Sequence, residues 1–200
     1  MYTNWQTALE ASGYVVSRSG SAVSTTTLAN NDVIVFDTSS HFGTATPADL
    51  LAFVQSGGSV ILLGGSGGST TWCPDINPYA SPLGFRFSRV SNDTSSCSGG
   101  DFDSNTNQTT SSSSHPITSG MTTSNYRQRT GYEVRNVSGT SDIVRLSSGS
   151  LPVVRVRQVG CGRVVAISDG GGARDNGTTE NWSSVRPFWL RVVDWAAFRL

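Results

Sequence analysis

The sequence contains no lysine and few charged residues of any kind. Its 14 basic residues are all Arg, and 14 acidic residues balance them, so the formal net charge is zero. Charged residues make up only 14% of the chain, whereas about 25% is usual for soluble domains. No net field attracts nucleic acid or an anionic membrane. We therefore predict that nucleic acid is not a partner.

Long hydrophobic runs are also missing. No stretch approaches the ~20 apolar residues that a membrane span requires, and the first residues show no basic-then-apolar signal pattern. We expect no membrane span. The 200 residues are enough for one substantial core, so we predict a single domain over residues 1–200. Its least regular part is a polar loop at about 91–114, rich in Ser, Thr, Asn, Asp and Gly.

Cysteine is scarce, with three residues, Cys73, Cys97 and Cys161. Three are too few for a disulfide scaffold but allow one bridge. Cys73 and Cys97 lie in loop-like sequence, where a disulfide bond would restrain the chain, so we predict that they pair. Glycosylation sequons occur at Asn92, Asn107, Asn136, Asn176 and Asn181. Together these features favour a secreted, extracellular or cell-surface protein and a candidate glycoprotein.

The apolar residues that are present indicate alternating helices and strands. Thr46-Pro47-Ala48-Asp49 is a strong helix start, with a capping Thr and Pro in the first turn. The apolar runs 32–37 and 59–63 are typical of buried parallel strands. We expect helices at 5–11, capped by Asn4, at 46–56 and at 185–198, and further strands at 14–18, 85–90, 132–137, 143–146, 153–157 and 163–168.

Several of these segments resemble a known family in order and spacing. They include "TPADLLAFVQSGGSVILLGG", "HPITSGM" and "VGCGRVVAISDGG". The chain resembles the ThuA-like branch of the class I glutamine amidotransferase-like superfamily over most of its length. The resemblance implies an α/β, flavodoxin-like fold with a mostly parallel sheet and flanking helices, here with an extra β-rich and loop-rich insertion. Many such domains lack the catalytic machinery and serve in surface, sugar-related or assembly roles.

Two departures from the family matter. The amidotransferases have a nucleophilic cysteine at a turn where this chain has Ser66, and a His-x-Glu pair where Pro116 and Ile117 follow His115. The family's first strand is also absent, because this chain starts at the first helix. In the family that strand lies between those we expect at 14–18 and 33–37. Unpaired strands there would cost free energy. We therefore predict an added strand, from the irregular middle of the chain or from a neighbouring molecule.

Ser66 lies in a Gly-x-Ser-x-Gly pattern, which exposes the nucleophile of α/β hydrolases at a strand-to-helix turn. The residues after it, Gly-Gly-Ser-Thr-Thr-Trp-Cys-Pro, are poor helix formers, so a simple glycine loop is the favoured interpretation. The alternative is a catalytic group of Ser66 with His41 or His115 as base and Asp37, or Asp169, as orienting acid. His115 is better explained as a backbone-bonding residue of its turn.

Two further patterns allow ligand binding. Asp101, Asp103, Asn105 and Asn107 alternate oxygen ligands as a Ca²⁺ loop does, but Thr106 and Ser112 replace its glycine and its final acid. A solvated polar loop is therefore favoured, with calcium as the alternative. Aromatic residues near loops could stack on sugars, although core packing explains them more simply. They are Trp72, Tyr79 and Trp182.

These observations predict a non-catalytic extracellular module that binds other proteins or assembles with itself, and needs no cofactor. A serine hydrolase using Ser66 is one alternative. A carbohydrate-binding or sugar-processing domain is another, on family analogy alone.

Overall fold

The computed structural model describes residues 2–18, 22–37, 43–64, 72–88, 108–110, 114–121, 133–146, 152–168, 170, 173 and 182–200. Its helices are α1 (Thr3–Ala11), α2 (Thr25–Ala29), α3 (Pro47–Gln55), α4 (Trp72–Ala80) and α5 (Trp182–Ala196). Its strands are β1 (Val33–Phe36), β2 (Ser59–Leu63), β3 (Phe85–Ser88), β4 (Gln108–Thr110), β5 (Glu133–Asn136), β6 (Ser141–Leu146), β7 (Pro152–Val159) and β8 (Gly162–Ile167).

The central sheet has six strands in the order β1-β2-β8-β7-β6-β4. β1, β2 and β8 are parallel neighbours, whereas β7, β6 and β4 extend the sheet through antiparallel pairs. Four strands, β1, β2, β8 and β6, therefore run in one direction. β3 and β5 form a separate antiparallel pair. The predicted α/β, flavodoxin-like class with a mostly parallel sheet and a β-rich insertion is confirmed.

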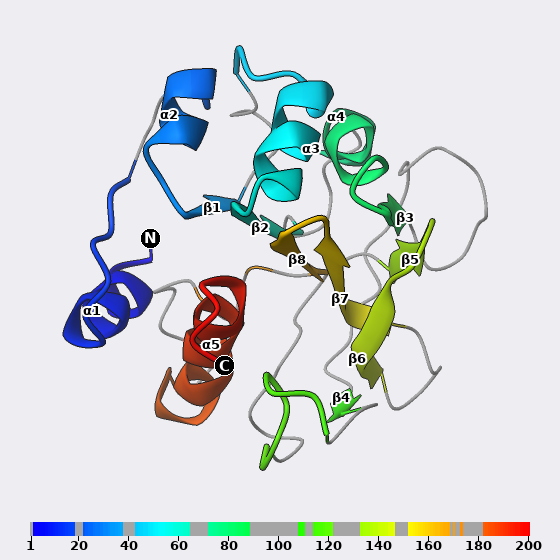
Figure 1. Ribbon diagram of the computed structural model, residues 1–200. Helices are drawn as coiled ribbons and strands as arrows, with labels where there is room; N and C mark the ends of the chain where they lie inside the picture. Colours follow the sequence, from blue (N-terminus) through cyan, green and yellow to red (C-terminus); the bar gives the residue numbers. More distant parts are fainter. Residues whose placement is uncertain are drawn as a thin grey trace.

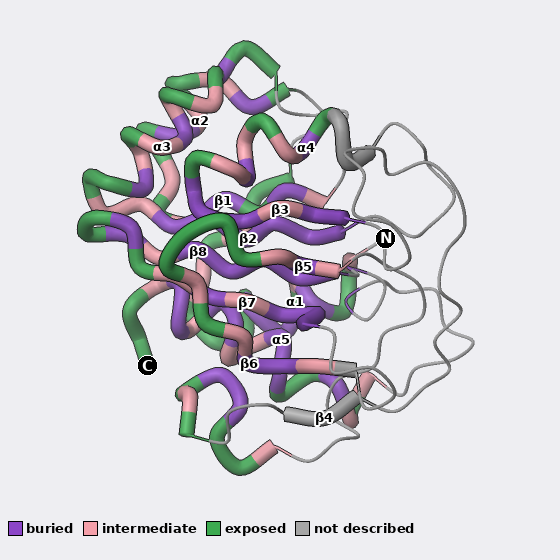
Figure 2. Tube along the Cα trace, turned by 90° about the vertical axis from the view of Figure 1, so that its right-hand side faces the viewer, coloured by how far each residue is buried: buried purple, intermediate pink, exposed green. Residues whose placement is uncertain are grey.

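Helices cover both faces of the sheet (Figure 1). α2, α3 and α4 lie on one face, where Phe36, Leu50 and Val60 belong to one apolar core. α1 and α5 lie on the other face, where Trp5, Ile61 and Trp189 belong to a second core. β2 lies between the two cores and is buried along its whole length, as the buried strands in Figure 2 show.

Local sequence signals account for the helix that the sequence predicted best. The Thr46 hydroxyl accepts a hydrogen bond from the Asp49 N–H, and the Asp49 carboxylate accepts one from the Thr46 N–H. These bonds satisfy two of the amides that a helix start leaves without partners. The hydrogen bonds from Thr46 also lower the pKa of Asp49. By contrast, Asn4 lies inside α1 and Tyr2 is its N-cap residue, without a side-chain cap.

α4 was missed in the sequence, where its region was expected to be a loop. Pro78 lies inside the helix, where proline removes a backbone hydrogen bond and so disfavours a helix on local grounds. Tertiary contacts outweigh this preference. Ile76 and Ala80 are buried, and the Asn77 amide exchanges two hydrogen bonds of 2.8 and 2.9 Å with the backbone of Phe87 in β3.

Three other boundaries differ from the prediction. The short helix α2, capped by the Ser24 hydroxyl, was not expected. β4 lies within the segment predicted as the long loop 91–114. α5 starts at Trp182 rather than 185, so Pro187 lies inside the helix. Burial of its apolar face, including Phe188, stabilises the longer helix despite the hydrogen bond that proline removes.

The strand predicted at 14–18 is not formed. These residues are described, but they belong to no strand. β1 pairs with β2 on one side, and no described strand pairs with its other side. Residues 14–18 therefore do not pair with 33–37. Direct pairing of these two segments would have excluded an added strand. The added strand, and the segment or molecule that supplies it, stay predictions.

Candidate binding groove

A groove runs along the open edge of β1. It has a volume of about 690 Å³ and three walls, formed by residues 13–17, by residues 30–33 with Val35, and by residues 196–199 at the end of α5 and directly after it. Leu9 and Val193, on the side of α1 and α5, contribute its apolar floor. Figure 1 shows residues 13–18 as the blue trace that leads from α1 toward α2, beyond the outer edge of β1.

The edge of β1 presents backbone groups to this groove. The Ser59 N–H donates to the Asp32 carbonyl at 2.8 Å, so the even-numbered residues of β1 direct their backbone toward β2. Since backbone groups alternate along a strand, the N–H and C=O of Val33 and Val35 point to the other side, into the groove. Such an edge is a template on which another strand can pair.

Apolar side chains are exposed beside this edge. Val35 in β1 is 39% exposed, although its neighbours Ile34 and Phe36 are buried. Across the groove, Val15 is fully exposed. An apolar strand residue that is open to water on the helix-covered side of a sheet indicates that a covering element is missing.

The wall formed by residues 13–17 contacts α5 and the residues that follow it, rather than β1. The Tyr14 hydroxyl donates to Asp194 Oδ1 at 2.7 Å. The Arg199 guanidinium lies 3.9 Å from the centroid of the Tyr14 ring and donates to the Ser12 carbonyl at 3.0 Å. Partial burial, followed by the hydrogen bond and charge of Asp194, raises the pKa of Tyr14 well above its usual range. These contacts hold Ser12 and Tyr14 against the carboxyl-terminal region rather than against β1.

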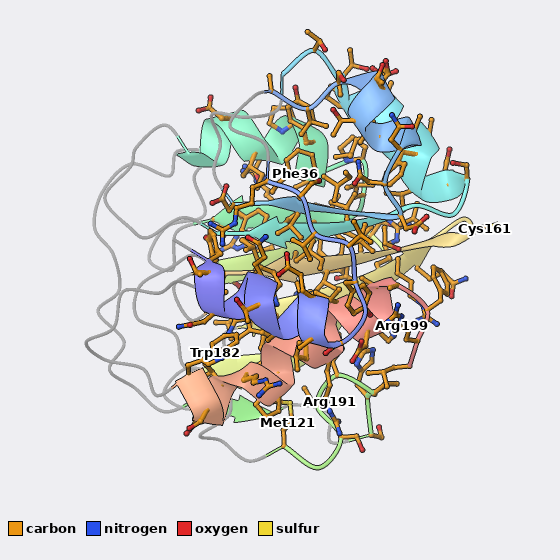
Figure 3. The ribbon with its side chains drawn as sticks, turned by 90° about the vertical axis from the view of Figure 1, so that its left-hand side faces the viewer. Phe36, Met121, Cys161, Trp182, Arg191 and Arg199 are labelled. Atoms are coloured by element: carbon orange, nitrogen blue, oxygen red, sulfur yellow. The ribbon has the colours of Figure 1, made fainter. Side chains whose placement is uncertain are left out.

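A second arginine fixes the end of the chain at the groove. Arg163 donates to the carbonyl of Trp195 at 2.6 Å and to that of Leu200 at 3.1 Å. Its guanidinium carbon lies 4.1 Å from the centroid of the Phe198 ring. Figure 3 shows this side of the molecule, with Arg199 near the end of α5. The wall formed by 196–199 is therefore positioned by β8.

Two charged residues, Asp32 and Arg199, line the groove, and they differ in their contacts. Arg199 is engaged by Tyr14 and Ser12, as described above. Asp32, at the amino end of β1, is exposed, and its carboxylate has no ion pair among the residues that the structure describes. The groove thus combines an apolar floor, open strand groups and one unpaired carboxylate at its end.

The residues of the hydrolase alternative are only partly described. Ser66, His41 and Asp169 lie outside the described residues, whereas Asp37 directly follows β1 and is half-buried. The catalytic group of Ser66, a histidine and an aspartate therefore stays a prediction. The first described helix after Ser66 is α4, which begins at Trp72.

His115 has a structural role in its turn. Its Nδ1 accepts a hydrogen bond from the Ile117 N–H at 3.2 Å, and its ring centroid lies 5.3 Å from that of Trp195. Burial, and to a lesser extent the charge of Arg163, lowers the pKa of His115. Arg191 of α5 donates to the Pro116 carbonyl and so fixes the turn, near Met121 in Figure 3.

Most other sites suggested by the sequence belong to segments outside the described residues. The calcium candidates Asp101, Asp103, Asn105 and Asn107, the Cys97 partner of the predicted disulfide, and the sequons at Asn92, Asn107, Asn176 and Asn181 lie outside the described residues. Cys73 belongs to α4, and its side chain is also outside them. Within the described part of the chain, no group of three or more potential metal ligands occurs, and Cys161 is exposed with a free thiol.

The remaining candidates have clear surroundings. Asn136 is exposed, and its Oδ1 accepts hydrogen bonds from the N–H and hydroxyl of Thr140. Tyr79 is partly buried against the core and donates to the Ala45 carbonyl at 3.3 Å. Trp182 also packs against a core. The side chain of Trp72 is not among those described. Core packing therefore accounts for Tyr79 and Trp182.

The groove was only partly foreseen. Its position follows from the gap expected between 14–18 and 33–37, but Val15, Val35 and Asp32 were not recognised as site residues. The one local signal is the apolar pair Val15-Val16. No local pattern predicts that residues 196–199 form a wall of the groove, because their position depends on how α5 packs.

Comparison with known proteins places the fold. No family model and no curated protein matches the sequence. Among solved structures, the cytoplasmic protein STM1381 from Salmonella typhimurium LT2 matches with a TM-score of 0.73 at 12% identity, over 98% of this chain and 86% of that chain. The N-terminal domain of mmIFT52 matches with a TM-score of 0.67 at 12% identity, over 98% and 90%.

The strand order and the helices on both faces of the sheet (Figure 1) define the class as an α/β domain with a flavodoxin-like sheet. More particularly, a protein described as ThuA-like, from Parabacteroides merdae, matches with a TM-score of 0.52 at 15% identity, over 98% of this chain and 84% of that chain. The chain therefore has a ThuA-like fold. At such identities the likeness concerns the fold alone. None of the described helices is long and apolar enough to cross a membrane.

Proposed function

We propose that this domain is a non-catalytic module that binds other polypeptides or assembles with copies of itself, in an extracellular or cell-surface setting. The observation that carries the proposal is the groove beside β1. Natural proteins usually protect strand edges with charged residues, bulges or covering elements. Here the edge combines open backbone groups with the exposed Val35 and Val15, which is the composition of an interaction surface.

The surroundings of Ser66 also favour binding over catalysis. A nucleophile elbow needs a helix directly after the serine, both to position it and to support an oxyanion hole. The seven residues Gly65–Thr71 are Gly, Ser and Thr only, and the first described helix beyond them begins at Trp72. His115, one of the proposed bases, already accepts a hydrogen bond at Nδ1 from the Ile117 amide.

The extracellular setting rests on the sequence. The surface is polar but carries few charges, and Asn136, within one of the sequons, is exposed. Glycosylation is tested by expressing the chain with a secretion signal in a eukaryotic host. A mass loss on treatment with an N-glycosidase, absent in Asn136→Gln, would support glycosylation at Asn136, a modification that is consistent with an extracellular setting. A secreted chain whose mass is unaffected would remove glycosylation at Asn136 from the proposal.

The experiment that tests the function measures the particle mass by light scattering over a concentration series. A mass above the 21.1 kDa of the monomer supports assembly, and Val35→Arg should then restore the monomer by placing a charge at the edge. Val137→Arg is the matched control, because Val137 is also an exposed valine, 52% exposed, but does not line the groove.

Catalysis is tested in parallel with a fluorophosphonate probe. Labelling that disappears in Ser66→Ala would overturn the non-catalytic proposal and favour the hydrolase alternative. A monomer without labelling would reject self-assembly and leave the binding of a different polypeptide.

A further inference from the structure

We propose that the groove beside β1 binds one extended β-strand from another polypeptide chain. The bound strand carries branched apolar residues at alternating positions and a basic residue next to Asp32. This inference rests on the proposed binding function and specifies its partner.

The backbone of the groove selects a peptide. Val33 and Val35 each offer an N–H and a C=O away from β2, because the alternate residues bond to β2. Their spacing along β1 is that of a strand ladder, which a second strand satisfies with main-chain hydrogen bonds. A small molecule or a helix does not reproduce this repeat. Strand addition to an open edge is an established mode of peptide recognition.

The floor of the groove selects the side chains. Leu9 of α1 and Val193 and Ala196 of α5 are buried apolar residues that line it. Every second residue of an added strand would face this floor and lie beside Val33 and Val35, since side chains alternate between the two faces of a sheet. Branched apolar residues make favourable cross-strand pairs with valine. The residues between them face away from α1 and α5.

The charge at one end selects a basic residue. Arg199 already donates to the Ser12 carbonyl and stacks on Tyr14. Asp32 is exposed at the amino end of β1 and lines the groove, with no ion pair among the described residues. A Lys or Arg of the bound strand therefore complements the carboxylate, although an exposed pair contributes modestly to affinity.

Within the 200 residues of the sequence, no segment outside the described residues has the pattern expected of this strand. The segments outside the described residues consist mainly of Ser, Thr, Gly and Asn, and none of them holds two of Val, Ile and Leu separated by one residue. The apolar alternating segments of this chain, such as β7 and β8, are already paired within its own sheet. A second copy could supply one of them only by opening that sheet.

Two fluorescein-labelled peptides test the inference by anisotropy titration against the full chain. The probes are Lys-Val-Thr-Val-Thr-Val and Val-Thr-Val-Thr-Val-Lys, which place the basic residue at opposite ends. We expect one of them to bind at least tenfold more tightly than Lys-Ser-Thr-Ser-Thr-Ser. The tighter peptide also reports strand direction, since Asp32 marks the amino end of β1. Binding should slow hydrogen exchange at the Val33 and Val35 amides.

Variants of the edge make the test specific. Val35→Pro removes an N–H that faces the groove but leaves the ladder with β2 intact, and proline is tolerated on edge strands. We expect it to weaken peptide binding at least tenfold. Val35→Thr is the matched control, because it keeps both the N–H and the branched shape. Asp32→Asn should weaken binding a few-fold and reduce its salt dependence. Thermal melts establish that each variant is folded.

The outcomes separate this inference from the proposed function. Equal binding of the valine and serine peptides, or unchanged binding by folded Val35→Pro, would overturn the strand site. If the protein nevertheless forms large particles that Val35→Arg disrupts, a second copy occupies the edge and the assembly function remains. Ser66-dependent labelling would reject the non-catalytic function, whereas the peptide titration would still decide on the groove.

Discussion

Gly64→Ala should disrupt the end of the sheet where β2 leaves it. A Cβ added at Gly64 would lie 1.7 Å from the Ser168 carbonyl oxygen and 2.4 Å from its carbon. Ordinary carbon contacts are about 3.5–4.0 Å, so the two backbones must separate. The separation breaks hydrogen bonds from the Gly64 N–H to Ile167 O, at 2.6 Å, and from the Gly170 N–H to Gly64 O, at 3.0 Å.

The expected cost follows from these two bonds. A lost hydrogen bond costs about 1 kcal/mol, and a buried group left without a partner costs about 1–3 kcal/mol. Gly64→Ala should therefore lower the free energy of unfolding by about 2–4 kcal/mol. Gly13→Ala is the matched control, since Gly13 has φ +82° but nothing within 4 Å of an added Cβ. Its conformational strain alone costs about 1–2 kcal/mol.

Urea denaturation followed by tryptophan fluorescence measures both changes. The midpoint of Gly64→Ala should fall further than that of Gly13→Ala, with the same dependence on denaturant. If Gly64→Ala is as stable as Gly13→Ala or more so, the close approach of Gly64 and Ser168 is not a constraint on the fold, and the reasoning is refuted.

Three further predictions concern polar contacts. Ser59→Ala should cost about 1–3 kcal/mol in urea denaturation, because the buried Ser59 hydroxyl donates to Ala196 O at 2.7 Å and accepts from the Arg163 N–H at 3.2 Å; Ser17→Ala, at an exposed position, should be neutral. Because burial lowers the pKa of His115 below its ordinary 6.5, the unfolded chain binds the proton more readily, so the unfolding free energy should fall as pH drops below about 6.5, and fall less in His115→Asn. Tyr14→Phe should cost about 1 kcal/mol at pH 7, because it removes a half-exposed hydrogen bond to a carboxylate. Because the pKa of Tyr14 is raised, the stability that its hydroxyl contributes should be lost as pH rises above about 10, and a tyrosinate absorbance titration should lose its latest step in Tyr14→Phe.

The elements that the sequence predicted well are those with strong local signals. α3 has its capping box at Thr46 and Asp49, and β2 is an uninterrupted apolar run. The hairpin of β7 and β8 turns at Gly160, whose φ of +60° suits glycine. In each case neighbouring residues suffice to define the element, because the cap, the run or the turn is contained within a few positions.

Other elements depend on contacts between distant residues. α4 contains Pro78 in its interior and forms because Asn77 bonds to the backbone of Phe87 and Ile76 is buried. Residues 14–18 have the composition of a strand, but they are held by Asp194 and Arg199 of the carboxyl-terminal region. No local pattern indicates a partner about 180 residues away.

The sequence by itself determined the α/β class, the low charge and most of the strands, because composition and apolar periodicity are local properties. It also predicted an added strand between residues 14–18 and 33–37, at the place where the structure shows the groove. Only the tertiary structure decided that this position is a groove with an apolar floor, open backbone groups at Val33 and Val35, and a carboxylate at its end. An edge is defined by the absence of a neighbour in space, and spatial neighbours arise only when the whole chain has folded.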